Sequence, residues 1–365
     1  MRHTRGRVVE VDTLDDLDLR LRAGAHDLGG WRVRSLDLRG TGDRLGRLSV
    51  GGAMFLGCDF DPGVESALEA AGAIVFPALP DTPVAVYRSA LYTAEELYGV
   101  GPYPESLDAR TYVWTEAEPD ADSLMAVTLH DHSIDLALTA WTEGRHLVGV
   151  MGGHALRRGE PAYAEAARLG RLLGHDHTVA TGGGPGAMEA ANLGATLAHV
   201  PETDLEEALT ALADVPDYRP DVGAWAARGV EVLGRFPDRT ETLGIPTWHY
   251  GHEPPNVCAT AIAKYVRNPV REAVLLDISS SGIVFLPGAA GTVQEVFQDA
   301  CENYYADPAS VAPMVLVGRR HWTETLPVWP LLQALADGRD MAAHVHLVDD
   351  VEEAALVVSE NMPHF

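Results

Sequence analysis

Two glycine-rich turns constrain the fold of this chain more than any other feature of its sequence. The first covers residues 181–189 (TGGGPGAME) and the second covers residues 287–295 (PGAAGTVQE), and each follows a short apolar run. Each pattern predicts a buried strand, a turn and the first turn of a helix. Glycine lets backbone N–H groups approach a ligand closely, and a helix N-terminus carries about half a positive charge. Two such turns in one α/β domain therefore predict a binding site for a phosphorylated small molecule.

The net charge limits the partners. The chain of 365 residues carries 27 basic and 53 acidic residues, which gives a net charge of −26. A surface of this sign repels nucleic-acid backbones, so we expect no nucleic-acid polymer as a partner. It also repels a nucleotide at long range, so a phosphate site must be made locally positive by helix dipoles and a few arginines.

The cysteines and the apolar segments indicate the cellular compartment of the protein. Cys58, Cys258 and Cys301 are too few and too widely spaced for a disulfide framework or a zinc site. The N-terminal residues form no apolar leader, and no apolar run is long enough to span a membrane. These features predict a cytoplasmic protein with no membrane partner and no bound metal.

The element pattern predicts two domains, at 1–115 and 116–365. The first is expected to be a small α/β accessory domain with a connecting arm, with strands at 7–11, 32–38 and 53–58 and a helix at 64–71. In the second, strands are expected at 147–151, 178–180, 243–248, 283–286, 314–317 and 345–348. Helices are expected at 122–142, 161–173, 205–213, 222–233, 257–280, 292–304 and 328–335. Strands that alternate with helices predict a parallel sheet covered on both faces.

In such a sheet, ligands bind at the carboxyl ends of the strands. The loops after Met151, Ala180, Trp248 and Leu286 are therefore expected to converge on one cleft.

The first glycine turn lacks the lysine and the hydroxyl residue of a Walker loop, and it lacks the three-glycine spacing of a dinucleotide fold. Neither ATP hydrolysis nor NAD binding follows from it. Its functional interpretation is a phosphate or ribose contact through the backbone of residues 183–186. The alternative is a glycine turn that is needed only for close helix packing.

In the second turn, Thr292 and Glu295 are the candidate functional side chains. The Thr292 hydroxyl can cap the helix or bind a phosphate oxygen, and a capping box would also explain a glutamate three residues later. On the preceding helix, Arg271 can bind a phosphate or hold the glutamate in place. The alternative for Arg271 is a surface residue paired with Glu272 or Glu253.

The strand-end loop at 249–256 (HYGHEPPN) contains two histidines but no third metal ligand at a suitable spacing. We therefore favour contacts to a base or a ribose, through Glu253 or Asn256, over metal binding.

Four phrases in this order resemble the LOG (Lonely Guy) superfamily: residues 152–154 (GGH), 181–190 (TGGGPGAMEA), 253–256 (EPPN) and 287–295 (PGAAGTVQE). Within that superfamily the chain resembles the bacterial pyrimidine/purine nucleotide 5′-monophosphate nucleosidases, which share the Gly-Gly-His and Glu-Pro-Pro-Asn phrases. The resemblance covers about residues 145–320 and does not extend to residues 1–115.

The resemblance implies a Rossmann-like fold and hydrolysis of the N-glycosidic bond of a nucleoside monophosphate, with Arg271 and Glu295 as the catalytic pair. It implies a homodimer or larger assembly and no cofactor, and by analogy an effector nucleotide that acts through residues 1–115. The implied substrate and phosphate contacts are Gly152, Gly153, His154, Gly183, Gly184, Gly186, Met188, Glu253, Asn256, Gly288, Gly291 and Thr292.

The sequence departs from the family at three positions. Ala289 replaces a glycine and would be strained if its φ were positive. Gln294 stands where plant-type members often have a glutamate, and Glu272 replaces the lysine of cytokinin-activating members.

Two other classes of protein stay open at this point. One is a nucleotide-binding or carrier protein without catalysis. The other is an amino-acid decarboxylase, which would need a cofactor lysine, and Lys264 is the only lysine of the domain.

Overall fold

Seven parallel strands form the larger sheet of the computed structural model, which describes residues 8–79, 82–249 and 253–361. Their order is β11-β10-β9-β5-β6-β7-β8. The strands are β5 Leu147–Met151, β6 Thr178–Thr181, β7 Leu243–Gly244, β8 Ala261–Ile262, β9 Ile283–Phe285, β10 Met314–Val317 and β11 Val345–Val348. The order reverses between β5 and β9, and ligands of open α/β sheets bind at the carboxyl ends of strands at such a point.

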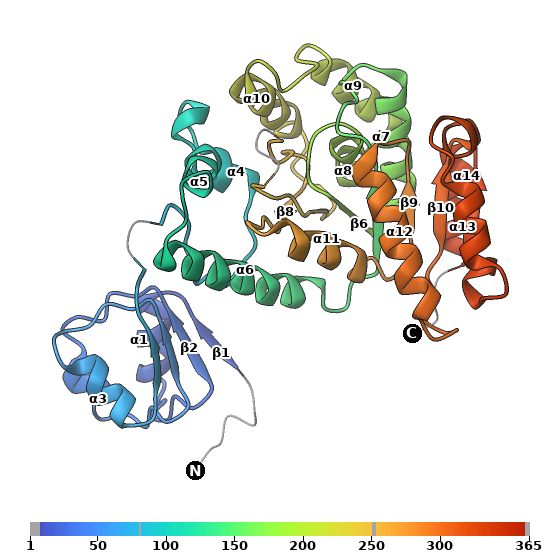
Figure 1. Cartoon of the computed structure of the whole chain (residues 1–365). Coiled ribbons are helices and arrows are strands. Elements are labelled where there is room, and N and C mark those ends of the chain that lie inside the picture. The colour runs from blue at the N-terminus through green and yellow to red at the C-terminus, as the bar shows by residue number, and fades with distance from the viewer. Residues whose placement is uncertain (1–7, 80–81, 250–252, 362–365) are drawn as a thin grey trace. The chain divides into compact units, whose positions relative to one another are not determined.

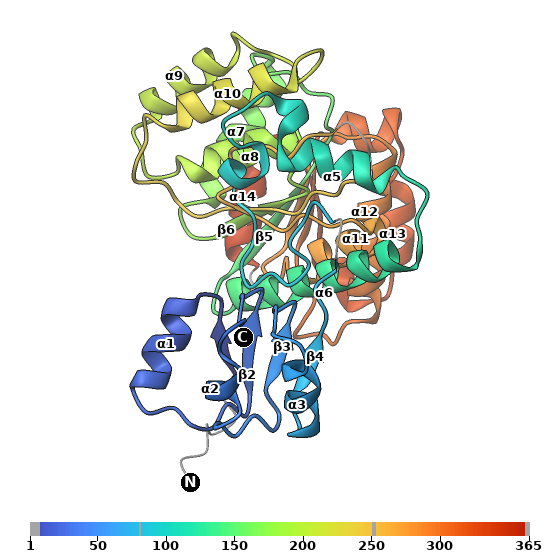
Figure 2. The ribbon, with the colours of Figure 1, turned by 90° about the vertical axis from the view of Figure 1, so that its left-hand side faces the viewer.

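Helices cover both faces of this sheet. Helices α7 (Pro161–Leu173), α8 (Ala187–Thr196) and α14 (Val351–Glu360) pack together, whereas α11 (Asn268–Asp277), α12 (Ala290–Tyr305) and α13 (Trp329–Ala336) form a second group. The strands run between the two groups, as Figure 2 shows. The predicted Rossmann-like architecture is confirmed.

The remaining elements of this part of the chain connect those layers (Figure 1). They are α4 Ala94–Tyr98, the 3-10 turn η1 Tyr103–Glu105, α5 Leu107–Thr115, α9 Glu202–Leu212, α10 Val222–Leu233, the π-helical turn η2 His321–Thr325 and the 3-10 turn η3 Asp340–Ala343.

Helix α8 carries the first glycine turn at its N-terminus and is buried along its whole length. Its close contact with α7 depends on two glycines. A Cβ on Gly194 would lie 1.8 Å from the carbonyl oxygen of Ala167, and a Cβ on Gly170 would lie 2.0 Å from that of Ala191. The fixed position of α8 in turn fixes the loop before it.

A second, four-stranded parallel sheet lies near the N-terminus, with its strands in chain order. Its elements are β1 Val9–Val11, α1 Leu14–Arg22, β2 Trp31–Arg34, α2 Gly42–Leu45, β3 Met54–Leu56, α3 Val64–Ala70 and β4 Ile74–Phe76. Val11, Val33, Phe55 and Val75 lie side by side in register and pack into one apolar core. The α/β fold predicted for this part of the chain is confirmed. Its successive strands pair in parallel, each with the next one in the chain, and so form a repeating unit.

The described chain divides into two compact units at places other than residue 115. The smaller unit is Met1–Ala90 with Glu118–Ala137, and the larger is Leu91–Ala117 with Leu138–Phe365. Helix α6 (Ala121–Thr142) therefore begins in one unit and ends in the other. The arm at 91–117 belongs to the larger unit because Tyr92 exchanges two backbone hydrogen bonds of 2.9 Å with Ile262 of β8.

In the larger sheet and its helices, two predicted elements differ most from the structure. The strand expected at 243–248 is only Leu243–Gly244, because Pro246 lacks the N–H that would continue the ladder. The helix expected at 257–280 is replaced by strand β8 and the shorter helix α11, which begins at Asn268 with Pro269 in its first turn.

Across the described residues, no helix combines the length and apolar character needed to cross a bilayer.

Candidate active site

The carboxyl ends of β5, β6, β7 and β9 open into one cavity of about 730 Å³. The loops after these strands supply most of its wall, as the strand order requires. The predicted residues that line it are Gly152, Gly153, His154, Gly184, Met188, Glu253, Arg271, Gly288, Gly291, Thr292 and Glu295. The predicted residues Gly183, Gly186 and Asn256 are not part of its lining.

Asn256 is fully buried and holds two loops together. Its Nδ2 donates to the carbonyl oxygen of Gly184 at 3.0 Å and to Oδ1 of Asn192 at 3.1 Å. Its Oδ1 accepts from the backbone N–H groups of Cys258 and Ala259. These bonds occupy both amide hydrogens and the oxygen of the side chain, so the contacts of Asn256 in this structure are structural.

Gly183 and Gly186 fit the packing alternative for the first turn. Both have positive φ, at 71° and 75°. A Cβ on Gly183 would lie 2.5 Å from Cδ of Pro246, and one on Gly186 would lie 2.6 Å from the carbonyl oxygen of Gly153. These glycines let the loops after β5, β6 and β7 approach one another closely.

Arg271 lies in the first turn of α11 and reaches across to the first glycine turn. Its Nε donates to the carbonyl oxygen of Ile245 at 2.6 Å, and its Nη2 donates to that of Gly182 at 3.2 Å. A Cβ on Gly182 would lie 2.1 Å from Nη2, so the glycine is what admits the guanidinium. Arg271 is buried, and its Nη1 lies 3.6 Å from Oε1 of Glu295 rather than beside Glu272 or Glu253.

Glu295 lies in the second turn of α12, with its carboxylate toward the cavity. Burial raises the pKa of Glu295 to about 7, against the opposing effect of the Arg271 charge. The nearby carboxylates of Glu272 and Glu253 raise this pKa further. A carboxyl with this pKa can gain or lose a proton near neutral pH, which general acid–base catalysis requires.

The start of α12 decides two questions that the sequence left open: whether Thr292 and Glu295 form a capping box, and whether Ala289 is strained. The helix begins at Ala290, with Ala289 as its N-cap and without a side-chain cap, so Thr292 and Glu295 do not form a capping box. Ala289 has φ of −117°, so the strain expected at this position does not arise. Within the described residues the Thr292 hydroxyl makes no hydrogen bond, and it lines the cavity beside Gly288.

On the opposite wall, Met188 lies over the first turn, where a Cβ on Gly184 would be 2.9 Å from its Cε. Nearby, Nδ1 of His154 lies 3.2 Å from Oε1 of Glu253. These contacts tie the Gly-Gly-His loop to the Glu-Pro-Pro-Asn loop across the cavity. The residues Tyr250, Gly251 and His252 lie outside the described residues.

Glu272 and Gln294 also line the cavity, although neither was predicted to be a site residue. Each directly precedes or follows a predicted catalytic residue in the chain. Gln294 Nε2 donates to Oε2 of Glu272 at 2.7 Å, and Asn268 Nδ2 donates to its Oε1 at 2.7 Å. A second contact between α11 and α12 therefore lies beside the Arg271–Glu295 pair.

Comparisons with known proteins bear on what this cavity does. No protein-family model matches the chain. Pyrimidine/purine nucleotide 5′-monophosphate nucleosidases of Escherichia coli (strain K12) and Escherichia coli O157:H7 are each 26% identical to it over 223 residues. The match covers 60% of this chain and 41% of each curated relative, so the chain matches less than half of their length.

The chain resembles the nucleotide 5′-monophosphate nucleosidases. This similarity, predicted from the four motifs, is confirmed by these relatives.

Solved structures with a similar fold include the molybdenum cofactor binding protein of Rippkaea orientalis, with a TM-score of 0.38 and 16% identity over 60% of this chain and 98% of that one. The Moco carrier protein of Chlamydomonas reinhardtii has a TM-score of 0.37 and 19% identity over 59% of this chain and 96% of that one.

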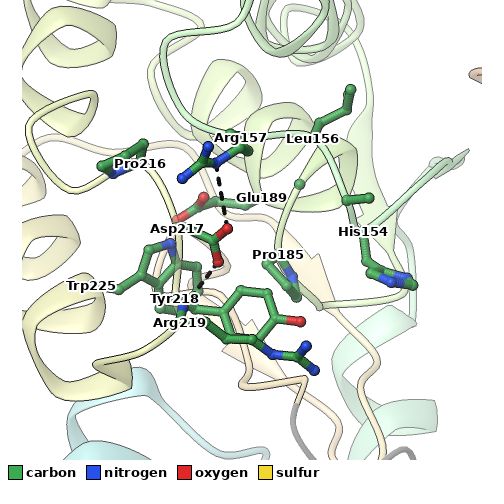
Figure 3. Close-up of a pocket in the computed structure, with 12 residues that line it drawn as sticks. His154, Leu156, Arg157, Pro185, Glu189, Pro216, Asp217, Tyr218, Arg219 and Trp225 are labelled. Carbon is green, nitrogen blue, oxygen red and sulfur yellow. Dashed lines mark hydrogen bonds and ion pairs between the residues drawn. The ribbon is translucent and has the colours of Figure 1, made fainter.

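A second, smaller cavity of about 210 Å³ has Gly186 in its lining. Figure 3 shows His154, Pro185 and Glu189 in its wall. Both carboxylates of this wall have an arginine partner. Arg157 Nε lies 3.4 Å from Oδ2 of Asp217, and Arg158 pairs with the buried Glu189. His154 lines both cavities, so the loop that carries it is a shared wall.

Lys264, the only lysine of the chain, is not available for cofactor chemistry. It is 1% exposed, its Nζ lies 2.5 Å from Oδ1 of Asp108, and it lies over the ring of Trp248. Burial lowers the pKa of the lysine, although Asp108 opposes this. Because the lysine is enclosed and does not line the cavity, it gives the decarboxylase alternative no support.

Proposed function

We propose that this chain hydrolyses the N-glycosidic bond of nucleoside 5′-monophosphates and releases a free base and ribose 5-phosphate. The observation that carries the proposal is the pair of Arg271 and Glu295 in a cavity bordered by the second glycine turn. The names of the curated relatives support the substrate class.

The phosphate subsite in this proposal is the turn before α12. Residues 288–292 line the cavity, and α12 is 16 residues long, so its N-terminal dipole favours an anion. No side chain of the described part of the chain caps this helix, which leaves its first N–H groups for a ligand. The Thr292 hydroxyl adds a further donor.

Glu295 is proposed to act on the sugar. As the C1′–N bond breaks, its electron pair leaves with the base nitrogen, and positive charge develops on the ribose. The carboxylate of Glu295 stabilises that charge and takes the proton of the water that attacks C1′. The departing base takes up a proton from solvent.

Arg271 is proposed to hold the carboxylate in place. Two backbone carbonyls fix its guanidinium, so its position does not depend on the substrate. A preorganised group of this kind contributes most when charge develops in a site shielded from water.

The test is incubation of the protein with nucleoside monophosphates, nucleosides and triphosphates, followed by chromatography for free base. Wild type is compared with Glu295→Gln, which keeps the size of the side chain and removes its charge. We expect base release from monophosphates and a loss of about 10²–10⁴-fold in kcat in the variant.

A matched control is Glu241→Gln, a carboxylate paired with Arg145 outside the cavity. Its rate should equal that of wild type. If no nucleotide releases base while monophosphates still bind, the hydrolase proposal fails and a carrier protein becomes the better explanation.

A further inference from the structure

His321 enters the cavity from a strand that carries no glycine motif. It begins the π-helical turn η2, which follows β10, and β10 pairs with β9, the strand before the second glycine turn. A Cβ placed on Gly318 would lie 3.4 Å from Cγ of Pro287 and 3.9 Å from Cβ of His321. His321 therefore lies beside the turn that begins at Pro287, and it lines the same cavity.

One nitrogen of this ring lacks a partner. Nε2 of His321 is buried and makes no hydrogen bond among the residues that the structure describes. A buried polar atom without a partner costs free energy, and such atoms call for an explanation such as a ligand. Because this nitrogen is buried, a contact with a ligand in the cavity requires the ring to turn about its second side-chain torsion, which is broad for histidine.

Each of the other nitrogen-bearing side chains of the cavity wall has at least one partner among the described residues. Arg271 donates to two backbone carbonyls and faces Glu295, and His154 faces Glu253. Gln294 donates to Glu272. His321 is thus the nitrogen-bearing side chain of this wall for which the described residues provide no hydrogen-bond partner.

We propose that His321 binds the 5′-phosphate of the ligand, together with the backbone N–H groups of residues 288–292, and thereby selects phosphorylated over unphosphorylated ligands. Imidazole donates a hydrogen bond from one ring nitrogen when neutral and from both when protonated, so the contact is available in either state. The proposal relies on the proposed function for the identity of the ligand, but it concerns binding and not bond cleavage.

The experiment measures dissociation constants by titration calorimetry in a Glu295→Gln background, which prevents turnover. The probes are adenosine and uridine 5′-monophosphates and the two matching nucleosides. His321→Phe keeps a ring against Trp322 and removes the nitrogens. We expect it to weaken monophosphate binding by about tenfold or more and to leave nucleoside binding unchanged.

The matched control is His346→Phe. Nε2 of His346 is likewise buried without a partner among the described residues, but this histidine lies on β11 and does not line the cavity. The control should bind monophosphates as tightly as the background protein.

An unchanged ratio of monophosphate to nucleoside affinity in His321→Phe overturns the proposal. If circular dichroism shows that this variant does not fold, the same ratio measured in His321→Leu, which also lacks a side-chain nitrogen, decides the question. If the ratio falls while wild type releases no base, the inference stands and the hydrolase proposal fails. If wild type binds no monophosphate, both fail.

Discussion

Nη1 of Arg271 lies 3.6 Å from Oε1 of Glu295, and the two side chains come from adjacent helices, α11 and α12. This separation is that of an ion pair and is too long for a close hydrogen bond. The shorter contacts of Arg271 go to the carbonyl oxygens of Ile245 and Gly182. The arginine is therefore fixed by the backbone, and the carboxylate oxygens stay available to a substrate.

The rate of base release should depend on pH through Glu295. Its pKa is raised to about 7, so the carboxyl is mostly protonated below that pH and mostly ionised above it. If the ionised form is the base, kcat/KM should rise about tenfold per pH unit below 7 and level off above it. The measurement is a kcat/KM profile from pH 5 to 9.

Glu272→Gln provides the internal check on this profile. It removes one of the negative charges that raise the pKa of Glu295, so the acidic limb should move to lower pH. The substrate phosphate also titrates, near pH 6, but it does so equally for every variant. An acidic limb at the same pH in Glu272→Gln and in wild type would show that another group controls it.

Gly182→Ala should lower activity without unfolding the protein. The added Cβ would lie 2.1 Å from Nη2 of Arg271 and 2.7 Å from Sδ of Met188. The guanidinium must then move away from its carbonyl anchors, and we expect kcat/KM to fall by at least about tenfold, because a displacement of 1 Å can cost a factor of about 10². Steady-state kinetics and thermal unfolding of the variant test this.

Gly101→Ala is the matched control, because a Cβ there meets only Oε2 of Glu105 at 3.7 Å, an ordinary contact. Equal activity in the two variants would mean that the position of Arg271 is not critical.

The central strands and several helices could be predicted from sequence because each of them has a local signal. β5 and β10 are uninterrupted apolar runs buried on both faces, and both have the predicted bounds. Helices α7 and α10 also have the predicted bounds, since a proline or an aspartate marks the start of each. The repeated parallel pairing of strands β1 to β4 in the smaller unit was not predicted, because these strands contain only three or four residues.

The candidate site was predictable only where a motif marks it. The family resemblance indicated Arg271 and Glu295. Of the two carbonyl oxygens that fix the arginine, that of Gly182 belongs to the first glycine turn, whereas that of Ile245 follows β7 and has no sequence signature. Asn256 lies in a motif yet serves the packing of loops. His321 had no signal of its own, since the π-helical turn that presents it follows a strand without a glycine turn.

The substitution Gly291→Ala distinguishes an effect on ligand binding from an effect on protein stability in the second glycine turn. Among the described residues nothing lies within 4 Å of a Cβ at this position, and alanine is more favourable than glycine in a helix by up to about 1 kcal/mol. We therefore expect unchanged or slightly higher thermal stability. If the phosphate approaches this backbone, KM for monophosphates should rise several-fold while kcat/KM for nucleosides stays the same. An unaltered KM for both would show that the phosphate binds elsewhere.

Asp299→Asn should stabilise the protein, and more so at higher pH. Asp299 is 6% exposed, its Oδ2 has no partner among the described residues, and burial raises the pKa of its carboxyl well above the usual value. The folded state thus keeps a proton that the unfolded chain releases above about pH 4, so the free energy of unfolding falls as pH rises toward the folded pKa. Asparagine has no proton to lose, and each pKa unit of the shift corresponds to about 1.4 kcal/mol. Urea unfolding at pH 4.5 and pH 8 should show a larger gain at pH 8, whereas the exposed Asp307→Asn should show none. An equal gain at both pH values would mean that Asp299 is ionised in the folded protein.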